Sequence, residues 1–505
     1  MKKIISLLEI KKYCQLQKNK GKKIVLAHGT FDLLHLGHVK HLEYAKKYGD
    51  ILIVTITADK YVKKGPDRPY FNHFKRSEML ASLSIVDKVC IVHESSAKDA
   101  IKNVQPNIYI KGNEYKNIKN DHTNKIGAEI FLVENFGGKI IYSDEETFSS
   151  SNLLNNYFSD RNKSLKLKLK KIKKNNILKK ILSDEHKIKK LKICLIGDTI
   201  IDTYKFVAPM GKSPKENMLS NLFKNEKKFC GGVLAAANNL SSFCENIEII
   251  THCYNKESEK KFIEKSLDKK IKIKNFKDIN VPVTTKIRYL EDGFNRKLFS
   301  VYEMNDFPRS QFYENKIVNF LSKNLSKYDV VIVTDFGHGF ISKKIKKIIE
   351  KKSKFLSVNT QSNSANHGFN LISEYKNAHY ICIDLPEARL ATKDKHSSPV
   401  FIAKKLMKKT NNYKYFSLTL GKNGSLVSTR QSTFQLESFT DSVVDTMGAG
   451  DVFFVITSIF AFLNYKIEEI SLIGNCAGCL KVKILGHQKK IHKEDLLSLI
   501  KTVLM

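Results

Sequence analysis

The sequence contains no apolar run long enough to cross a membrane and no cysteine framework. None of its 505 residues belongs to a stretch of about 20 consecutive apolar residues, the length that a membrane-spanning helix needs. In the N-terminal stretch MKKIISLLEIKKYC, Glu9 and Lys11 interrupt the apolar residues before a signal-peptide core could form. The nine cysteines are scattered, which favours a reducing compartment. We therefore expect a cytoplasmic protein with no membrane span.

The chain also lacks the second pair of ligands that a zinc site would need. Cys476 and Cys479 form a single C-x-x-C pair without nearby histidine ligands. Because structural zinc sites use four ligands, we interpret this pair as packing residues rather than as a metal or redox site.

Acidic residues are few relative to basic ones. The chain has 51 Asp and Glu against 87 Lys and Arg, a formal net charge of +36. Such a charge could indicate nucleic-acid binding, but the lysines are spread over the whole chain and no nucleic-acid-binding motif is present. We expect no nucleic acid partner, and part of the charge would steer anionic substrates instead.

The length of 505 residues predicts two or three domains.

The first informative stretch is HGTFDLLHLGH at residues 28–38. It follows an apolar run at 24–27 that predicts a buried strand, and it precedes a helix-like segment at 39–48. A strand, a glycine turn and a helix start form a phosphate site, because the first helical N–H groups point at the ligand. His35 and His38 flank Gly37 and can donate hydrogen bonds to phosphate oxygens. For H-x-G-H alone, two surface histidines at a turn would be a sufficient explanation.

Apolar runs then alternate with helix-like segments, which predicts a doubly wound α/β sheet with ligands at the carboxyl ends of its strands. The further strands are expected at 50–57, 89–92 and 108–110. Lys111 directly follows the last of them, where a phosphate contact is expected. Ser149, Ser150 and Ser151 open an apolar helix, where serine can cap the helix or help to bind an anion.

GTFDLLHLGH resembles the signature of the cytidylyltransferase-like nucleotidyltransferases, which join a nucleoside triphosphate to a phosphorylated small molecule and release pyrophosphate. RPYFNHFKRSEMLASLSIVD, KGNEY and FSSSNLL are similar to the nucleotidyltransferase half of the bifunctional heptose kinase/adenylyltransferases of lipopolysaccharide precursor synthesis, over about residues 22–158. A looser similarity to glycerol-phosphate cytidylyltransferase keeps CTP open as the nucleotide.

This resemblance implies that His35 and His38 contact the triphosphate and that Lys111 holds phosphate, all three as catalytic residues. The remaining nucleotide-binding residues that it implies are Gly29, Thr30, Phe31, Asp32, Gly37, Arg76, Ser149, Ser150 and Ser151.

Residues 159–190 are dominated by lysine, with apolar residues interposed. A basic amphipathic helix on a membrane surface or an acidic partner would fit this pattern. An exposed interdomain connector is favoured, because such a composition cannot build a core of its own.

The second half begins with an apolar strand at 193–196, and Asp202 follows it. A carboxylate just past a first strand can accept hydrogen bonds from sugar hydroxyls. Gly231 and Gly232 precede a helix of small residues, where they allow close approach of the backbone to a ligand. Further strands are expected at 330–334, 355–358 and 380–383, and a pair of strands within 284–302.

The decisive stretch of this half is DTMGAGD at residues 445–451, which leads into an apolar helix. The backbone N–H groups of Gly448, Ala449 and Gly450 form a cradle for the charge on a transferring phosphoryl group. Asp451 at the helix start can accept the proton of an attacking hydroxyl.

DT-x-GAGD, together with Thr419, Gly421 and Gly424, closely resembles the signature of the ribokinase (PfkB) sugar-kinase family, over about residues 191–500. The resemblance implies that Asp451 is the catalytic base and that Gly448, Ala449 and Gly450 make the anion hole. It also implies roles for three further groups: Thr419, Gly421, Gly424 and Asn475 at ATP; Asp202, Gly231 and Gly232 at the sugar; and Asp384 and Glu387, in an N-x-x-E element, as indirect organisers of Mg²⁺. Mg²⁺ itself would bridge ATP oxygens.

Two residues depart from the family pattern. Ala235 stands where an asparagine is usual after the diglycine, and Asp384 replaces the asparagine of N-x-x-E. The phosphoryl-transfer residues are intact, so the departures leave the identity of the sugar open.

We therefore predict an α/β protein with three parts. These are a doubly wound, Rossmann-like nucleotidyltransferase domain at 1–158, a Lys-rich linker at 159–190 and a ribokinase-like kinase domain with a small β lid at 191–505, the reverse of the usual order. The expected function is synthesis of an activated sugar such as ADP-heptose, with ATP and sugar phosphates as substrates. The alternatives are a CTP-activated polyol or other sugar, and a nucleotide-binding protein with a degenerate kinase half. Whether the chain acts as a homodimer stays open.

Overall fold

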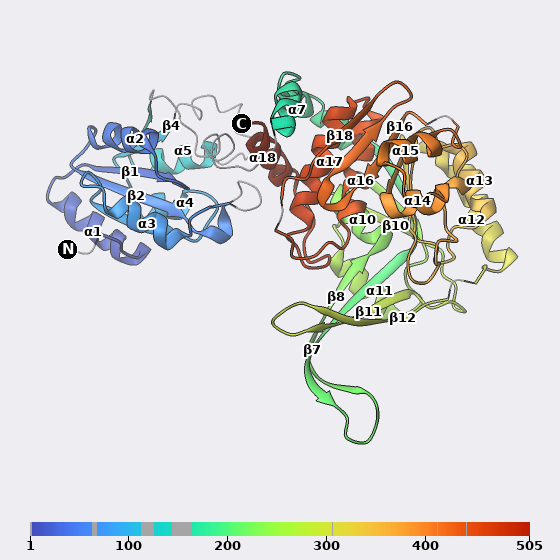
Figure 1. The fold of residues 1–505 in the computed structure, drawn as a ribbon. Coiled ribbons are helices and arrows are strands. Elements are labelled where there is room, and N and C mark those ends of the chain that lie inside the picture. The colour runs from blue at the N-terminus through green and yellow to red at the C-terminus, as the bar shows by residue number, and fades with distance from the viewer. Residues whose placement is uncertain are drawn as a thin grey trace. The chain divides into compact units, whose positions relative to one another are not determined.

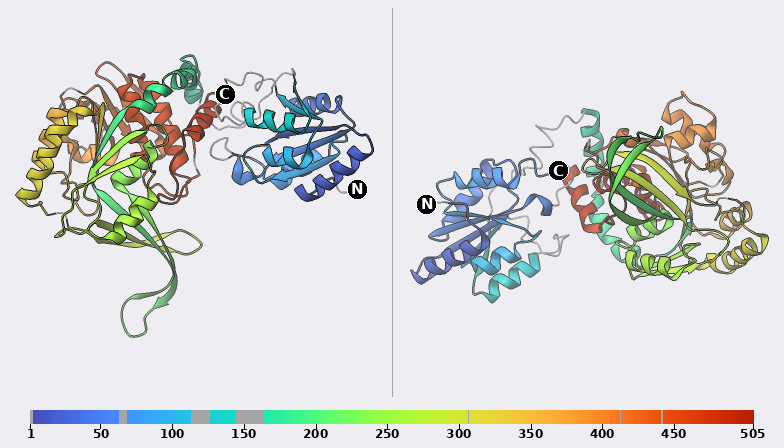
Figure 2. Two further views of the ribbon diagram at one scale, coloured as in Figure 1. Left: turned by 180° about the vertical axis from the view of Figure 1, so that it is seen from behind. Right: turned by 90° about the horizontal axis from the view of Figure 1, so that it is seen from below.

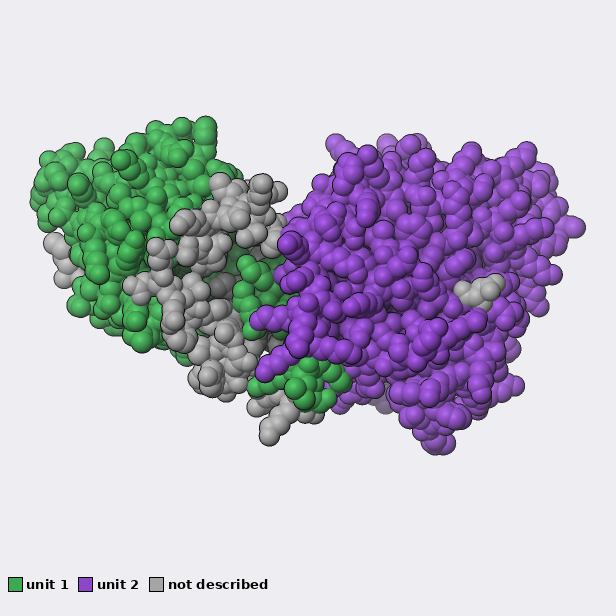
Figure 3. Space-filling model, turned by 90° about the horizontal axis from the view of Figure 1, so that it is seen from above, with its two compact units in different colours: residues 1–169, 497–505 green, residues 170–496 purple. Residues whose placement is uncertain are grey.

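The computed structural model describes residues 3–62, 68–112, 126–143, 163–305, 307–411, 413–440 and 442–505. The chain divides into two compact units, one of residues 1–169 with 497–505 and one of residues 170–496 (Figure 3). Among the described residues, no helix combines the length and the apolar character that crossing a membrane needs.

The first unit contains a five-stranded sheet of order β3-β2-β1-β4-β5 in which every neighbouring pair is parallel. Its strands are β1 (Ile24–Gly29), β2 (Ile51–Thr57), β3 (Lys88–Val92), β4 (Ile108–Gly112) and β5 (Lys139–Ser143). Its helices are α1 (Leu7–Asn19), α2 (Leu36–Lys46), α3 (His73–Ala81), α4 (Lys98–Val104) and α5 (Ile126–Asn135). The order reverses at β1, so the crevice beside its carboxyl end is the expected ligand site of such a sheet.

Alternate residues of β1 face two separate cores. Ile24 and Leu26 pack with residues of α1, α4 and α5, whereas Val25 and Ala27 pack with residues of α2 and α3. Helices therefore cover both faces of the sheet (Figure 1), which confirms the predicted doubly wound fold. The strand is apolar at every position from 24 to 27 because both of its faces are buried.

The second unit is built on a nine-stranded sheet of order β10-β9-β6-β13-β14-β15-β16-β17-β18. Neighbouring strands are parallel from β10 to β16, and β17 and β18 add antiparallel strands at one edge. The strands are β6 (Lys192–Gly197), β9 (Asn246–Thr251), β10 (Ile271–Asn275), β13 (Val330–Asp335), β14 (Leu356–Thr360), β15 (Tyr380–Asp384), β16 (Tyr415–Thr419), β17 (Ser425–Ser428) and β18 (Thr433–Leu436).

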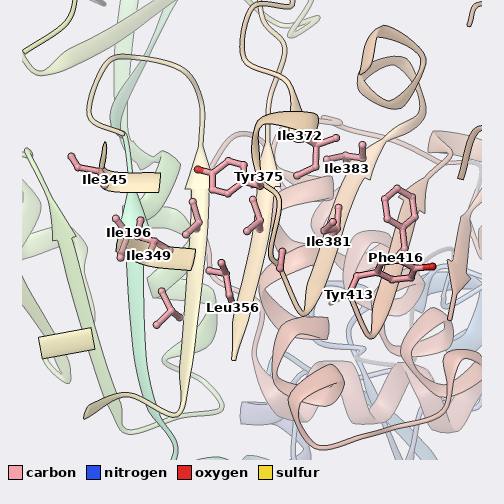
Figure 4. Packing of buried hydrophobic residues seen from close by; sticks show 14 of the residues in the cluster. Ile196, Ile345, Ile349, Leu356, Ile372, Tyr375, Ile381, Ile383, Tyr413 and Phe416 are labelled. Carbon is pink, nitrogen blue, oxygen red and sulfur yellow. The ribbon is translucent and has the colours of Figure 1, made fainter. Parts of the chain in front are cut away.

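Helices cover both faces of this sheet as well (Figure 2). On β15, Ile381 and Ile383 belong to the core shown in Figure 4, which α12 (Gln311–Asn324), α13 (Lys343–Lys352), α14 (Leu385–Thr392) and α15 (Pro399–Met407) complete. Tyr380 points to the opposite face, where its hydroxyl lies 2.7 Å from that of Thr457 on α16. The other helices are α10 (Gly232–Leu240), α11 (Glu257–Ser266), α16 (Ala449–Phe462) and α17 (Ile467–Lys481). The helix α18 (Lys493–Leu504) crosses the boundary between the two units at residue 497.

A second, four-stranded sheet of order β12-β11-β7-β8 corresponds to the predicted small β lid. Its strands are β7 (Thr199–Lys212), β8 (Leu219–Gly231), β11 (Thr284–Glu291) and β12 (Lys297–Glu303). The far end of the β7–β8 hairpin projects from the rest of its unit in both ribbon figures (Figures 1 and 2). Asp202 of β7 and Arg288 of β11 form an ion pair at the site described below.

The Lys-rich segment differs from the exposed connector that its composition favours. Its described part forms α7 (Lys163–Lys173), α8 (Ile177–Ser183) and α9 (Glu185–Lys190). Ile177, Ile181 and Ile188 are buried. Ile177 and Ile181 are four residues apart, which gives α8 one apolar face although lysine dominates the overall composition.

Candidate functional sites

In the first unit, the loop after β1 has the geometry of a ligand-binding turn. Phe31 and Leu33 both have a φ of 48°, a left-handed conformation that is uncommon for such residues and marks strain at functional sites. A Cβ on Gly29 would lie 3.1 Å from the Phe31 ring, so the bend is tight. The loop leads directly to the first turn of α2, which contains Gly37.

His35 and His38 lie together at this helix start. His35 is the N-cap residue of α2, and its carbonyl accepts the His38 N–H at 2.9 Å. The two imidazoles stack with ring centroids 3.9 Å apart, and the Phe31 ring lies 5.2 Å from that of His38. The structure thus brings both predicted histidines to the N-terminus of one helix, where backbone N–H groups and imidazoles can act on the same anion.

Asp32 and Arg76 stabilise the loop through bonds within the protein. The Asp32 carboxylate is buried and accepts the N–H groups of Tyr70 and Phe71. Arg76 is fully buried and donates to Asp59 Oδ1 at 2.6 Å and to three backbone carbonyls, those of Thr30, Thr57 and Phe71. The resemblance placed Arg76 near the nucleotide. In the structure its guanidinium ties the signature loop to the end of β2, and a role near the nucleotide stays a prediction.

Lys111 lies at the carboxyl end of β4, as expected, but its ammonium is 2.8 Å from Glu129 Oε2 on α5. The pKa of Glu129 is lower than usual. Burial raises it, but the charge of Lys111 and the hydrogen bonds from Lys111 and the Ala97 N–H outweigh burial. His41 is also close, since its Nδ1 lies 2.9 Å from Ser143 Oγ, which donates to the Lys111 carbonyl at 3.4 Å. Burial and the charge of Lys111 lower the pKa of His41 to about 4. Sequence reasoning missed Glu129 and His41. The H-x-x-H spacing from His38 to His41, one helical turn apart, was a usable signal for the latter.

The predicted phosphate-binding serines Ser149, Ser150 and Ser151 lie outside the residues that the structure describes.

In the second unit, the glycine turn at the start of α16 faces a cluster of charged side chains. Gly448 has a φ of +72°, and a Cβ there would lie 2.6 Å from His487 Cε1. A Cβ on Gly450 would meet no described atom within 4 Å, so the backbone at Gly450 is open to a ligand, whereas the Ala449 N–H donates to the Thr446 carbonyl at 3.3 Å. An anion cradle at this turn stays a prediction of the sequence.

Asp451 lies in the first turn of α16 and is largely buried. Burial raises its pKa to about 6, the charge of Asp202 raises it too, and Lys481 and a hydrogen bond from Gln361 act in the opposite direction. Lys481 is fully buried at the end of α17, and burial lowers its pKa to about 8. A carboxylate that titrates near neutrality is suited to accept a proton from a hydroxyl.

The predicted sugar-binding residues also meet. A Cβ on Gly231 would lie 2.3 Å from Asp202 Oδ2, and one on Gly232 would lie 2.4 Å from the Asp198 carbonyl. Both positions therefore need glycine. Asp202 forms an ion pair with Arg288 of β11, and its Oδ2 is 3.8 Å from His487 Nε2.

Several charged or polar side chains of this site were not predicted from the sequence. Among them are Arg288, Gln361, Lys481, His487, Lys286 and Asp445, the last of which bonds Lys297 at 2.8 Å and Tyr204 at 3.1 Å. Asp445 is the first residue of the DTMGAGD motif, but the motif gave this residue no role. The others belong to no local motif.

The residues predicted beside ATP lie around β16 to β18. Thr419 ends β16, and Gly421 and Gly424 shape the turn to β17 with φ values of 56° and 85°. Gly424 tolerates no side chain, since a Cβ would lie 2.0 Å from the Leu436 carbonyl. Asn475 of α17 donates to the carbonyls of Leu436 and Glu437, so its amide N–H groups hold the end of β18.

Asp384 and Glu387 form a reciprocal capping box at the start of α14. Asp384 Oδ1 accepts the Glu387 N–H at 2.7 Å, and Glu387 Oε2 accepts the Asp384 N–H at 2.9 Å. Burial and the charge of Asp384 raise the pKa of Glu387 to about 9. Ala235, the other departure from the family pattern, is buried in α10.

Comparison with known proteins defines the class. Residues 190–494 match the family model of the pfkB family carbohydrate kinases, and the chain belongs to that family. Residues 26–155 match the cytidylyltransferase-like model, so the order of the two regions is the predicted one.

The two relatives described here match this chain over its N-terminal part alone. A bifunctional protein HldE from a Nitratiruptor species is 46% identical over 122 residues, 24% of this chain and 26% of that protein. Another, from Aliarcobacter butzleri, is 44% identical over 133 residues, 26% of this chain and 28% of that protein. The match thus spans about a quarter of each relative's length.

Among solved structures, phosphofructokinase-2 from Escherichia coli in complex with substrates and products has a TM-score of 0.50 at 12% identity. It covers 62% of this chain and 98% of that one. At this identity, the likeness shows the fold of the second unit alone.

Proposed function

We propose that this chain is a bifunctional enzyme of activated-sugar synthesis, an ATP-dependent sugar kinase joined to a sugar 1-phosphate nucleotidyltransferase. The observation that carries the proposal is Asp451, a largely buried carboxylate with a pKa of about 6 beside the glycine turn of a pfkB-family unit. The stacked His35 and His38 at the start of α2 support the second activity.

In the kinase step, Asp451 accepts the proton of the acceptor hydroxyl. The hydroxyl oxygen bonds to the γ-phosphorus of ATP, and the bond from that phosphorus to the ADP oxygen breaks. The backbone N–H group of Gly450, at the open side of the glycine turn, binds the charge that develops on the phosphoryl oxygens.

Both families use ATP-type substrates, typically with Mg²⁺. Among the described residues no group of three or more His, Cys, Asp or Glu side chains is placed to hold a metal ion. Mg²⁺ would be held chiefly by nucleotide phosphates and water, with Asp384 and Glu387 as indirect organisers. When bound, the ion neutralises phosphate charge.

In the transferase step, a phosphate oxygen of the sugar 1-phosphate bonds to the α-phosphorus of the nucleotide, and pyrophosphate leaves. His35, His38 and the first N–H groups of α2 would stabilise the charge on the leaving pyrophosphate. The resemblance to heptose enzymes favours ATP and a heptose 1-phosphate, and CTP with a polyol phosphate is the alternative. All nine cysteines are free and buried, and we propose the cytoplasm as the compartment.

The first experiment measures pyrophosphate release by the purified protein with Mg²⁺, using ATP or CTP against a panel of sugar 1-phosphates and polyol phosphates. Release with ATP and a heptose 1-phosphate supports the ADP-heptose assignment. Release only with CTP moves the protein to another pathway, and no release across the panel contradicts the transferase proposal.

Two substitutions test whether the activities use separate sites. Asp451→Asn should abolish sugar phosphorylation and leave pyrophosphate release intact, because it removes only the kinase base. His35→Ala should do the opposite, lowering pyrophosphate release on the order of 100-fold. Both activities are measured on both variants, and loss of both from either change contradicts the two-site proposal.

A degenerate kinase half is the second candidate. Ala235 supplies no amide where the family has one, and Asp384 adds a charge beside Glu387. Nucleotide binding without phosphorylation of any sugar in the panel would favour this candidate.

A further inference from the structure

Gln361 lies directly after β14 and donates from Nε2 to Oδ1 of Asp451 over 2.7 Å. We propose that Gln361 is a positioning residue for the base: it holds one carboxylate oxygen of Asp451 and leaves the other directed at the acceptor hydroxyl. This inference rests on the proposed kinase function and deepens it.

The segment around Gln361 is fixed before any substrate binds. The Gln361 N–H donates to the Asp335 carbonyl at 2.9 Å, and the Gln361 carbonyl accepts from Asn366 Nδ2 at 2.8 Å. The next residue, Ser362, donates its N–H to Glu387 Oε1 at 3.1 Å. Bonds to the end of β13 and to α14 thus hold the donor in place, and a donor held by its surroundings costs little reorganisation during the reaction.

The charges around Asp451 show why such a donor matters. Asp202 of β7 raises the pKa of Asp451, in addition to the effect of burial. Lys481 of α17 and Lys286 of β11 lower it. Glu387 of α14 also lies in range, because the charge of Asp451 is one of the causes that raise its pKa.

Gln361 is the neutral donor of this set, and it bonds the carboxylate directly. A hydrogen bond to the charged form of a group favours that form. Gln361 therefore helps to keep the base ionised near neutral pH, in addition to orienting it.

The pH dependence of kcat/KM for sugar phosphorylation tests the proposal, because its acid limb reports the base of the free enzyme. Gln361→Met keeps the length of the side chain and removes the donor. It should move the acid limb to higher pH by about one unit. Gln361→Glu should move it at least as far, since two carboxylates would then share the site.

Gln431→Met is the matched control, because Gln431 lies on an exposed turn of the same unit. Its acid limb should coincide with that of the wild type. An acid limb that stays unchanged in both Gln361 variants overturns the positioning role.

A second test needs no turnover. At pH 8, Gln361→Met should lower the melting temperature of the full chain by roughly 2–4 °C. In an Asp451→Asn background the same change should cost less than half as much, because the bond would then join two neutral amides. Equal losses in both backgrounds overturn the inference. Failure of the wild type to phosphorylate any sugar overturns the proposed kinase function instead, and this thermal cycle still decides whether Gln361 and Asp451 are coupled.

Discussion

Asp451 combines two opposing demands on one residue. As a base it must be ionised, yet its surroundings raise its pKa from 3.8 to about 6. The folded protein therefore binds a proton at Asp451 more tightly than the unfolded chain does. Keeping this carboxylate ionised in the folded state therefore lowers the free energy of unfolding. This loss is absent below about pH 4, grows between about pH 4 and 6, and has its full size above about pH 6.

Asp451→Asn should consequently stabilise the kinase unit while abolishing phosphorylation. At pH 7 we expect a gain of up to about 3 kcal/mol in the free energy of unfolding, and almost none at pH 4. Urea unfolding of the wild type and the variant at intervals between these pH values measures the difference. A gain that is the same at every pH would contradict the titration argument.

The site residues that could be predicted from the sequence are those that belong to a short motif. His35, His38 and Asp451 stand in HLGH and GAGD, and the structure puts each at a helix start. Gln361 could not be predicted in this way, because its partner is 90 residues away. Arg76 shows the converse: a motif marked it, but only the structure reveals that its donors bind backbone carbonyls and Asp59.

At the scale of elements, the capping box of α14 explains how the chain accommodates Asp384. Asp and Asn are about equally good N-caps, so the replacement of asparagine in N-x-x-E preserves the helix start. The replacement also places a second carboxyl group beside Glu387, and the charge of Asp384 raises the pKa of Glu387.

Asp384→Ala and Asp384→Asn should therefore behave differently. The alanine variant loses the bond to the Glu387 N–H and should lose about 1 kcal/mol in the free energy of unfolding. The asparagine variant keeps an acceptor and removes the like charge, so its stability at pH 8 should equal or exceed that of the wild type. Denaturant unfolding of the three proteins decides, and equal losses in both variants would argue against the cap.

Strands that are buried on both faces were predicted from the sequence, whereas exposed strands were missed. The parallel strands β1, β6 and β13 are buried on both faces, so unbroken apolar runs revealed them. The β7–β8 hairpin was not predicted, because its outer half is exposed and its sequence, from 208 to 228, is largely polar with scattered apolar residues. β5 was also missed, since its KIIYS offers only two consecutive aliphatic residues.

At the scale of the whole molecule, two units with separate cores explain how one chain can carry two sites. Each unit has the core that an independent fold needs. Motif order alone was enough to predict this arrangement, whereas composition alone misjudged how the Lys-rich segment packs.

Residues 170–190 belong to the second unit in the structure. Lys180 Nζ is 2.8 Å from Glu469 Oε2 and lies 3.8 Å from the centroid of the Tyr465 ring. Tyr465 in turn donates to Asp184 Oδ2 at 3.0 Å. Since Glu469 is only 1% exposed, removing Lys180 would leave a buried carboxylate without its cation, which is costly.

A kinase fragment of residues 191–505 should thus be less stable than one of residues 170–505. The shorter fragment loses the burial of Ile177, Ile181 and Ile188 as well as the Lys180–Glu469 pair, several kcal/mol in total. Its melting temperature should be lower by roughly 10 °C. Lys180→Met in the longer fragment is the control: it removes the cation and keeps the isoleucines, so its loss should be smaller. Equal melting temperatures for the two fragments would instead identify the segment as the solvated connector that its composition suggests.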